Sequence, residues 1–158
     1  MKVFLDTNVL LDILSDVRPG HHDALTLLQV IKKRRLSACL TTQSIIDASY
    51  VQTQSSKGSV EQFREAIRAL SSFLEIISID AFDLDAANHC RIPDYEDAAQ
   101  IACALNHFCD AIITGDQAFS RYTTLPIYSP ATFSDALFDE SPFPSGDALD
   151  RNGPDSCL

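Results

Sequence analysis

The sequence feature that most constrains the fold is a short apolar run near the start of the chain that ends in a carboxylate. Residues 3–5 are all apolar and do not alternate with polar side chains, which is typical of a strand buried on both faces of a parallel sheet. Asp6 follows directly, and a helix capped by Thr7 or Asn8 is expected to continue to Leu14. Ligands bind at the carboxyl ends of strands in such sheets, so Asp6 is either a helix cap or part of a site.

The rest of the chain alternates between strand-like and helix-like segments. Strands are expected at 3–5, 36–40, 76–79, 111–113 and 125–128. Further helices are expected at 21–35, from 42 to Lys57-Gly58, and at 59–74, 80–90, 94–105 and 130–137, with a capping box at Ser59 and a cap at Asp94. Such alternation predicts an α/β fold, a three-layer α/β/α sandwich around a mostly parallel five-stranded sheet.

Four aspartates are expected at one edge of this sheet. Asp6 and Asp116 follow strands, while Asp47 and Asp97 lie in the early turns of helices that begin at the same edge. Carboxylates gathered this way are costly as bare charges, but their oxygen atoms suit hard divalent cations. Because no Cys-His or Ser-His arrangement is evident, the chemistry they support best is metal-assisted hydrolysis of a phosphodiester, in which a cation lowers the pKa of the attacking water.

The net charge of -10 would ordinarily argue against a nucleic-acid partner. Residues 138–158 hold five acids and one Arg and so carry -4, which leaves -6 on residues 1–137. Four of those six charges would belong to the shared site, where divalent cations could reverse the local potential. The basic cluster, Lys32-Lys33-Arg34-Arg35, either complements the dipole of the helix it ends or contacts phosphates.

Length and composition predict one domain over residues 1–137, followed by a flexible acidic tail over 138–158. No apolar stretch approaches the roughly 20 residues that span a bilayer, and the chain enters a strand directly instead of a signal peptide. We therefore expect a cytoplasmic protein without membrane contact. The odd number of cysteines and the lack of Cys-x-x-Cys argue against a zinc site or a disulfide framework, and Cys39 and Cys103 are expected in the core.

Three short motifs, taken together, resemble the PIN-domain family over about residues 1–137. The motifs are Val-Phe-Leu-Asp6-Thr-Asn8, Asp94-Tyr-Glu-Asp97-Ala-Ala-Gln-Ile-Ala and Ile-Ile-Thr114-Gly-Asp116-x-x-Phe119. The resemblance implies a PIN-like fold and an endoribonuclease that depends on Mg²⁺ or Mn²⁺ and hydrolyses RNA. It also implies the VapC-like toxin of a toxin-antitoxin pair, with an antitoxin partner and a homodimer.

The resemblance assigns roles to residues of this chain. Asp6 and Asp97 match the main metal ligands, and Asp116 matches the acid after the fourth strand. Asn8 and Thr114 match polar positions that orient carboxylates or water. Each of those two could equally be a cap or turn residue, and Asp94 is either a helix cap or an outer-shell ligand.

Asp47 departs from the family pattern, because the family usually carries Glu there. The shorter side chain reaches about one C–C bond less far and could bind metal through water. This departure, with the shortage of basic surface, motivates an alternative function: a catalytically degenerate PIN-like module that binds RNA or protein. A phosphatase and a receiver domain fit poorly, since Asn8 replaces the second Asp of Asp-x-Asp and no Lys occurs after Arg91.

The apolar faces of the early helices are the candidate surfaces for a dimer or for an antitoxin. They are expected near Leu10, Leu14 and Tyr50.

Overall fold

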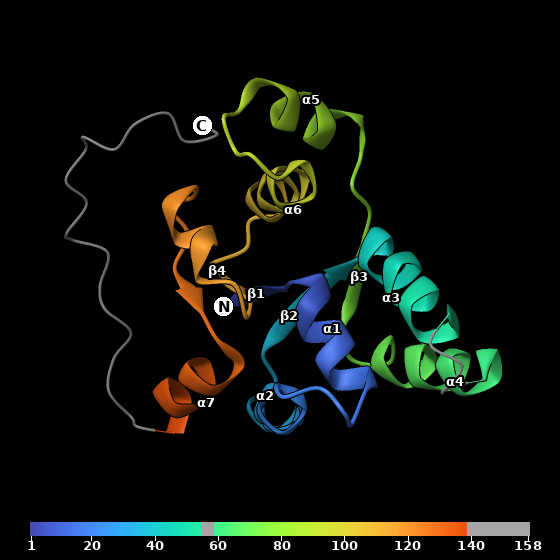
Figure 1. The fold of residues 1–158 in the computed structure, drawn as a ribbon. Helices are drawn as coiled ribbons and strands as arrows, with labels where there is room; N and C mark the ends of the chain where they lie inside the picture. The colour runs from blue at the N-terminus through green and yellow to red at the C-terminus, as the bar shows by residue number, and fades with distance from the viewer. Residues whose placement is uncertain (55–58, 139–158) are drawn as a thin grey trace.

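A five-stranded parallel sheet forms the centre of the molecule (Figure 1), as the alternating sequence predicts. The structure, a computed structural model, describes residues 1–54 and 59–138. Its strands are β1 (Lys2–Leu5), β2 (Ser37–Thr41), β3 (Glu75–Ile77), β4 (Ala111–Ile113) and β5 (Ile127–Tyr128). Their order across the sheet is β3-β2-β1-β4-β5, and each neighbouring pair is parallel. The predicted α/β fold with a parallel sheet is therefore confirmed.

Helices connect the strands and cover the sheet. They are α1 (Thr7–Leu14), α2 (His21–Arg34), α3 (Thr42–Gln54), α4 (Val60–Leu70), α5 (Ala81–His89), α6 (Tyr95–Asn106) and α7 (Pro130–Phe138), with a 3₁₀ turn, η1 (Gln117–Arg121), after β4. The expected end of the third helix at Lys57-Gly58 lies outside the described residues, and so does the expected tail beyond residue 138. None of the helices described is long and apolar enough to cross a membrane.

The alternation of side chains along each strand divides the core between the two faces of the sheet. Val3 and Leu5 of β1 point to a cluster that α1, α2, α4 and α7 complete. Phe4 points to the opposite face, where it packs with Ile101 of α6 and Phe119 of η1. Both faces of the sheet are buried, which explains why the strand sequences are continuous apolar runs. Cys39 and Cys103 belong to the second cluster, so their predicted core positions are confirmed.

The sheet register brings the carboxyl ends of β1 and β4 together. Leu5 pairs with Ile113, and the Asp6 N–H donates to the Ile113 carbonyl over 3.0 Å. Asp6 and Thr114, the residues that follow these strands, are therefore neighbours at one edge of the sheet. On the other side of β1, Thr41 ends β2 at the same edge, and its hydroxyl accepts a hydrogen bond from the Ser44 N–H at 2.9 Å.

Caps predicted from the sequence are formed in the structure, with one exception. Ser59 forms a capping box with Gln62, and the Asp94 side chain accepts hydrogen bonds from the first turn of α6. For α1 the expected cap at Thr7 or Asn8 was wrong: Asp6, for which a cap was one of two alternatives, occupies the cap position, although no side-chain capping hydrogen bond is formed. The Asp6 carboxylate has partners elsewhere, which are described below.

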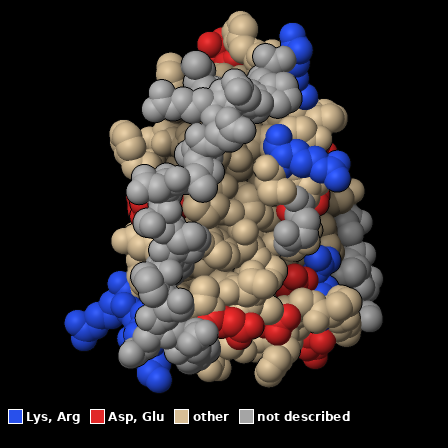
Figure 2. All heavy atoms as spheres, turned by 90° about the vertical axis from the view of Figure 1, so that its left-hand side faces the viewer, with Lys and Arg blue, Asp and Glu red and all other residues tan. Residues whose placement is uncertain are grey.

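The basic cluster lies at the edge of the sheet opposite Asp6. Lys32, Lys33 and Arg34 form the last turn of α2, and β2 begins at Ser37, so this turn lies at the amino edge of the parallel sheet. The Lys32 ammonium lies 4.7 Å from the centre of the Phe73 ring, and Arg34 Nη2 donates to the Leu137 carbonyl over 2.9 Å. Figure 2 shows Lys and Arg side chains in small separate groups on the face that it presents.

Candidate active site

Asp6 is the buried centre of the candidate site. Its side chain is only 3% exposed, and its Oδ2 accepts a hydrogen bond of 2.7 Å from the Thr114 hydroxyl. Asn8 Nδ2 lies 3.5 Å from the same oxygen. The Asp116 N–H donates to Thr114 Oγ1 over 2.9 Å and so fixes the hydroxyl that bonds to Asp6. Burial raises the pKa of Asp6, and the hydrogen bond from Thr114 partly offsets that effect.

Asp97 shares the electrostatic environment of Asp6. It lies half-buried in the first turn of α6, and its pKa is raised to about 6, first by burial and then by the charges of Asp94, Asp6, Asp116 and Glu96. The ordinary value for this carboxyl is 3.8. The sheet register and the hydrogen bonds through Thr114 place Asp6 and Asp116 at one edge, and the hydrogen bond from Thr7 to Glu96 holds the start of α6, with Asp97, beside them.

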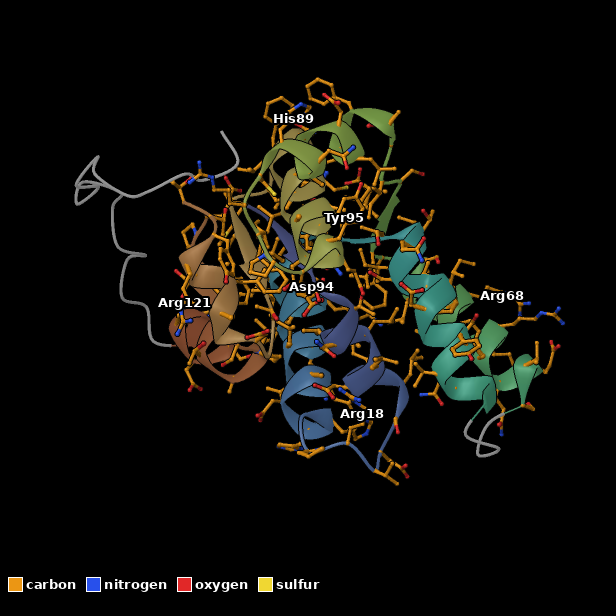
Figure 3. All side chains as sticks on the ribbon, turned by 45° about the horizontal axis from the view of Figure 1, so that its top comes forward. Arg18, Arg68, His89, Asp94, Tyr95 and Arg121 are labelled. Carbon is orange, nitrogen blue, oxygen red and sulfur yellow. The ribbon has the colours of Figure 1, made fainter. Side chains whose placement is uncertain are left out.

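Asp94 and Asp116 have structural partners as well as a place near the site. Asp94 Oδ1 accepts hydrogen bonds from the Glu96 N–H at 2.9 Å and the Asp97 N–H at 3.2 Å. Asp116 Oδ1 accepts one of 2.7 Å from the N–H of Ala118 in η1. Figure 3 shows Asp94 and Tyr95 side by side at the start of α6. Each acid therefore caps a helix or turn that begins at the edge of the sheet where Asp6 lies.

Asp47 is placed differently from the other predicted acids. It lies in α3, where its Oδ1 accepts a hydrogen bond of 2.9 Å from Gln43 Nε2, one turn earlier on the same helix. It is not among the charges that act most strongly on Asp97. The structure thus gathers three of the four predicted acids and pairs the fourth with a neighbour on its own helix.

Sequence reasoning missed a polar group that lies beside these acids. Glu96 Oε1 accepts hydrogen bonds from the Thr7 hydroxyl at 3.2 Å and from Gln100 Nε2 at 2.9 Å. Thr7 Oγ1 is also 2.9 Å from the hydroxyl of Ser44 in α3. The only sequence signal was the crowding of Asp94, Glu96 and Asp97 within four positions. Nothing in the sequence indicates that residues of α1, α3 and α6 share one hydrogen-bond network.

The carboxylate oxygens at this edge suit a divalent cation that keeps much of its water. Within the described part of the chain, no three Asp, Glu, His or Cys side chains are gathered closely enough to hold a metal ion by themselves. Mg²⁺ usually binds one or two carboxylates and retains several waters, so a closed cage is not required. Gln100 Oε1 is a buried acceptor without a hydrogen-bond partner, as expected beside a hydrated ligand. Asp6 and Asp97 are the residues that would hold the cation.

Comparison with known proteins shows the family. A family model described as PIN domain matches residues 2–118, and the chain belongs to that family. No curated protein matches the sequence.

Solved structures with the same fold are distant in sequence. They include VapBC2 from Rickettsia felis bound to a DNA fragment from its promoter, with 18% identity, a TM-score of 0.65 and coverage of 82% of this chain and 98% of that one. VapC20 from Mycobacterium tuberculosis, a toxin that cleaves the sarcin-ricin loop, has 15% identity, a TM-score of 0.60 and coverage of 75% and 92%. A toxin-antitoxin complex from Klebsiella pneumoniae has 19% identity, a TM-score of 0.58 and coverage of 81% and 97%.

The raised pKa of Asp97 makes a prediction for the metal-free protein. Since the folded-state pKa lies above the ordinary value, the stability contributed by protonated Asp97 is lost as the pH rises through about 6. Asp97→Asn cannot ionise, so we expect its Tm to exceed that of the wild type at about pH 8 and to approach it near pH 4. Asp16→Asn, which removes an exposed charge between α1 and α2, is the control. An equal gain from both variants at high pH would contradict the local repulsion.

Proposed function

We propose that this PIN-domain protein is a divalent-cation-dependent endoribonuclease and the toxin of a toxin-antitoxin pair. The observation that carries the proposal is the gathering of Asp6, Asp97 and Asp116 at the carboxyl edge of the sheet, where burial and then the neighbouring charges raise the pKa of Asp97. Without a cation such an arrangement costs stability, so its presence favours a cation-binding role. Family membership makes phosphodiester hydrolysis the chemistry to test first.

The residues of the chain have separate tasks in this proposal. Mg²⁺ or Mn²⁺ would supply Lewis acidity and a more acidic water at the site. Asp6 and Asp97 hold the cation, and the Thr114 hydroxyl fixes Asp6 so that its carboxylate does not rotate away. Asp116, which fixes Thr114 through its N–H, adds a further negative charge that acts on Asp97. The result is a preorganised anionic pocket that accepts a cation and, through it, a phosphate.

RNA approaches an acidic protein most easily where positive charge is local. The chain carries -10 overall, and the basic cluster of α2 lies at the amino edge of the sheet, away from Asp6. On the face in Figure 2, described acidic side chains form a short strip near the lower edge, and basic side chains lie in several separate groups. The bound cation is therefore the main positive charge that a scissile phosphate would meet.

Protein partners are part of the proposal. The structures similar to this chain from Rickettsia felis and Klebsiella pneumoniae contain toxin-antitoxin complexes. For this chain we propose an antitoxin partner and a homodimer. Leu14 lines an open apolar groove with Leu28 of α2 and Phe73, whereas Tyr50 lies on exposed α3. Leu10, expected at such a surface, is fully buried because it faces the core, so that expectation was wrong.

A second candidate function is a degenerate module that binds RNA or protein without cleaving it. The placement of Asp47 favours it, since this acid is paired with Gln43 and is not drawn into the cluster. A binder would retain affinity for RNA in the presence of a chelator and show no cation-dependent cleavage. The two functions are therefore separated by one assay on a panel of labelled RNAs.

We expect cleavage of that panel to require Mg²⁺ or Mn²⁺ and the buried acid. Asp6→Asn and Asp97→Asn should each lower the cleavage rate by about 100-fold or more, because each removes a charge that holds the cation. Circular dichroism should show an intact fold. Glu65→Gln, which removes an exposed charge of α4, should cleave like the wild type. Cleavage that survives a chelator, or Asn variants with normal rates, would contradict the proposal.

The basic cluster is expected to act on stability and not on RNA. Replacing residues 32–35 with Gln should cost a few tenths to about 1 kcal/mol per charge, because the C-terminal end of the α2 dipole loses its cations. The slope of log K for RNA against log salt concentration should not change. If the cluster contacts phosphates, the slope should fall by about 0.7 for each lost contact with a single strand.

A further inference from the structure

A continuous hydrogen-bond chain runs from the buried edge of the sheet to Glu96. The Ser44 N–H donates to Thr41 Oγ1 at 2.9 Å, and the Thr41 and Ser44 hydroxyls are 2.9 Å apart. Ser44 is in turn 2.9 Å from the Thr7 hydroxyl, which donates to Glu96 Oε1 over 3.2 Å. Gln100 Nε2 donates to both Thr7 Oγ1 and Glu96 Oε1.

The protons of this chain can be arranged in one direction only. Glu96 is an acceptor, so the Thr7 proton must point toward it. Thr7 Oγ1 must then accept from the Ser44 hydroxyl, and Ser44 must accept from Thr41. Thr41, Ser44 and Gln100 are each at most 2% exposed, so the chain is shielded from water until it reaches Glu96. Aligned bonds of this kind polarise one another and are strongest at the charged end.

The same argument fixes the orientation of the Gln100 amide. A flipped amide would place its carbonyl oxygen against the Glu96 carboxylate, where both groups accept and neither donates. The amide nitrogen therefore faces Glu96, and Oε1 is left buried without a donor. An unpaired buried acceptor costs about 1 to 3 kcal/mol. A group that brings its own protons, such as the water of a hydrated cation, would remove that cost.

The network also ties together the two segments that carry the buried acids. Thr7 directly follows Asp6, and Glu96 directly precedes Asp97. The hydrogen bond between Thr7 and Glu96 therefore joins the start of α1 to the start of α6 beside those acids. Glu96 adds its charge to the group that acts on Asp97, whereas Asp47 is paired on α3.

We propose that Glu96 is a further carboxylate of the cation site, held through Oε1 by the Thr41–Ser44–Thr7–Gln100 chain while Oε2 accepts from the water of a hydrated divalent cation. It supplies from α6 the carboxylate that Asp47 does not supply from α3. This inference rests on the proposed function, because it needs a cation at Asp6 and Asp97. Thr7 and Gln100 are positioning residues that act through Glu96.

Mn²⁺ titration calorimetry of the full chain tests the inference with a double-mutant cycle. Glu96→Gln should raise the Kd for Mn²⁺ about 10-fold. Thr7→Val changes no charge and should raise the Kd about 3- to 10-fold in the wild-type background, but not further in the Glu96→Gln background. Glu65→Gln reports the effect of a remote lost charge, and Tyr95→Phe reports a change at the start of α6 outside the network. Neither control should alter the Kd.

The outcomes separate this inference from the proposed function. If Asp6→Asn abolishes Mn²⁺ binding but Glu96→Gln behaves like Glu65→Gln, the metal site stands and the role of Glu96 is overturned. If Thr7→Val weakens binding equally in both backgrounds, it acts through Asp6 and the positioning role is overturned. Wild-type protein that binds no Mn²⁺ overturns both. Should Thr7→Val not fold, Gln100→Met removes the other hydrogen bond to Glu96 and takes its place in the same cycle.

Discussion

Repulsion between carboxylates is the constraint on which the candidate site depends. The strand order places the ends of β1 and β4 side by side, so the acids that follow these strands meet whether or not a cation is present. The chain limits the cost by giving three of the acids a donor: Thr114 for Asp6, and backbone N–H groups for Asp94 and Asp116. The pKa of Asp97 is nevertheless raised, first by burial and then by the charges of the neighbouring acids. The remaining imbalance is what a divalent cation would neutralise.

Helix α6 is built for close approach to this edge. Ala98, Ala99 and Ala102 are buried small residues, and they allow the helix to lie against its neighbours while Gln100 is enclosed among them. A buried amide is tolerated in a core only when its polar atoms are paired. Here the nitrogen is paired with Thr7 and Glu96, and the oxygen is not. The site therefore contains both an excess of negative charge and an amide whose oxygen lacks a donor.

Membership of the PIN domain family does not by itself decide what this chain does. The three solved structures named above are under 20% identical to it, and at that distance a fold is retained while site residues change. In this chain the departure at Asp47 is accompanied by Glu96 on α6, held by side chains of β2, α1 and α3. Acidic groups at this edge come from different elements, because α1 and α3 begin there directly after strands and the hydrogen bond from Thr7 to Glu96 holds the start of α6 beside α1.

The sequence by itself determined the order of strands and helices, the burial of both sheet faces and the meeting of Asp6 with Asp116. Those features follow from the local pattern of apolar residues and from the geometry of parallel strands. Both can be recognised in a single segment of the sequence. Only the tertiary structure decided that Asp47 pairs with Gln43 and that Glu96 is held by Thr7 and Gln100. Helical spacing places a residue on a turn, but its partner depends on how closely two helices pack and on which rotamer the neighbours leave open. Glu96, the exposed acid beside the predicted ones, was visible in the sequence. The buried chain of hydroxyls that orients it forms only when α1, α3 and α6 pack together.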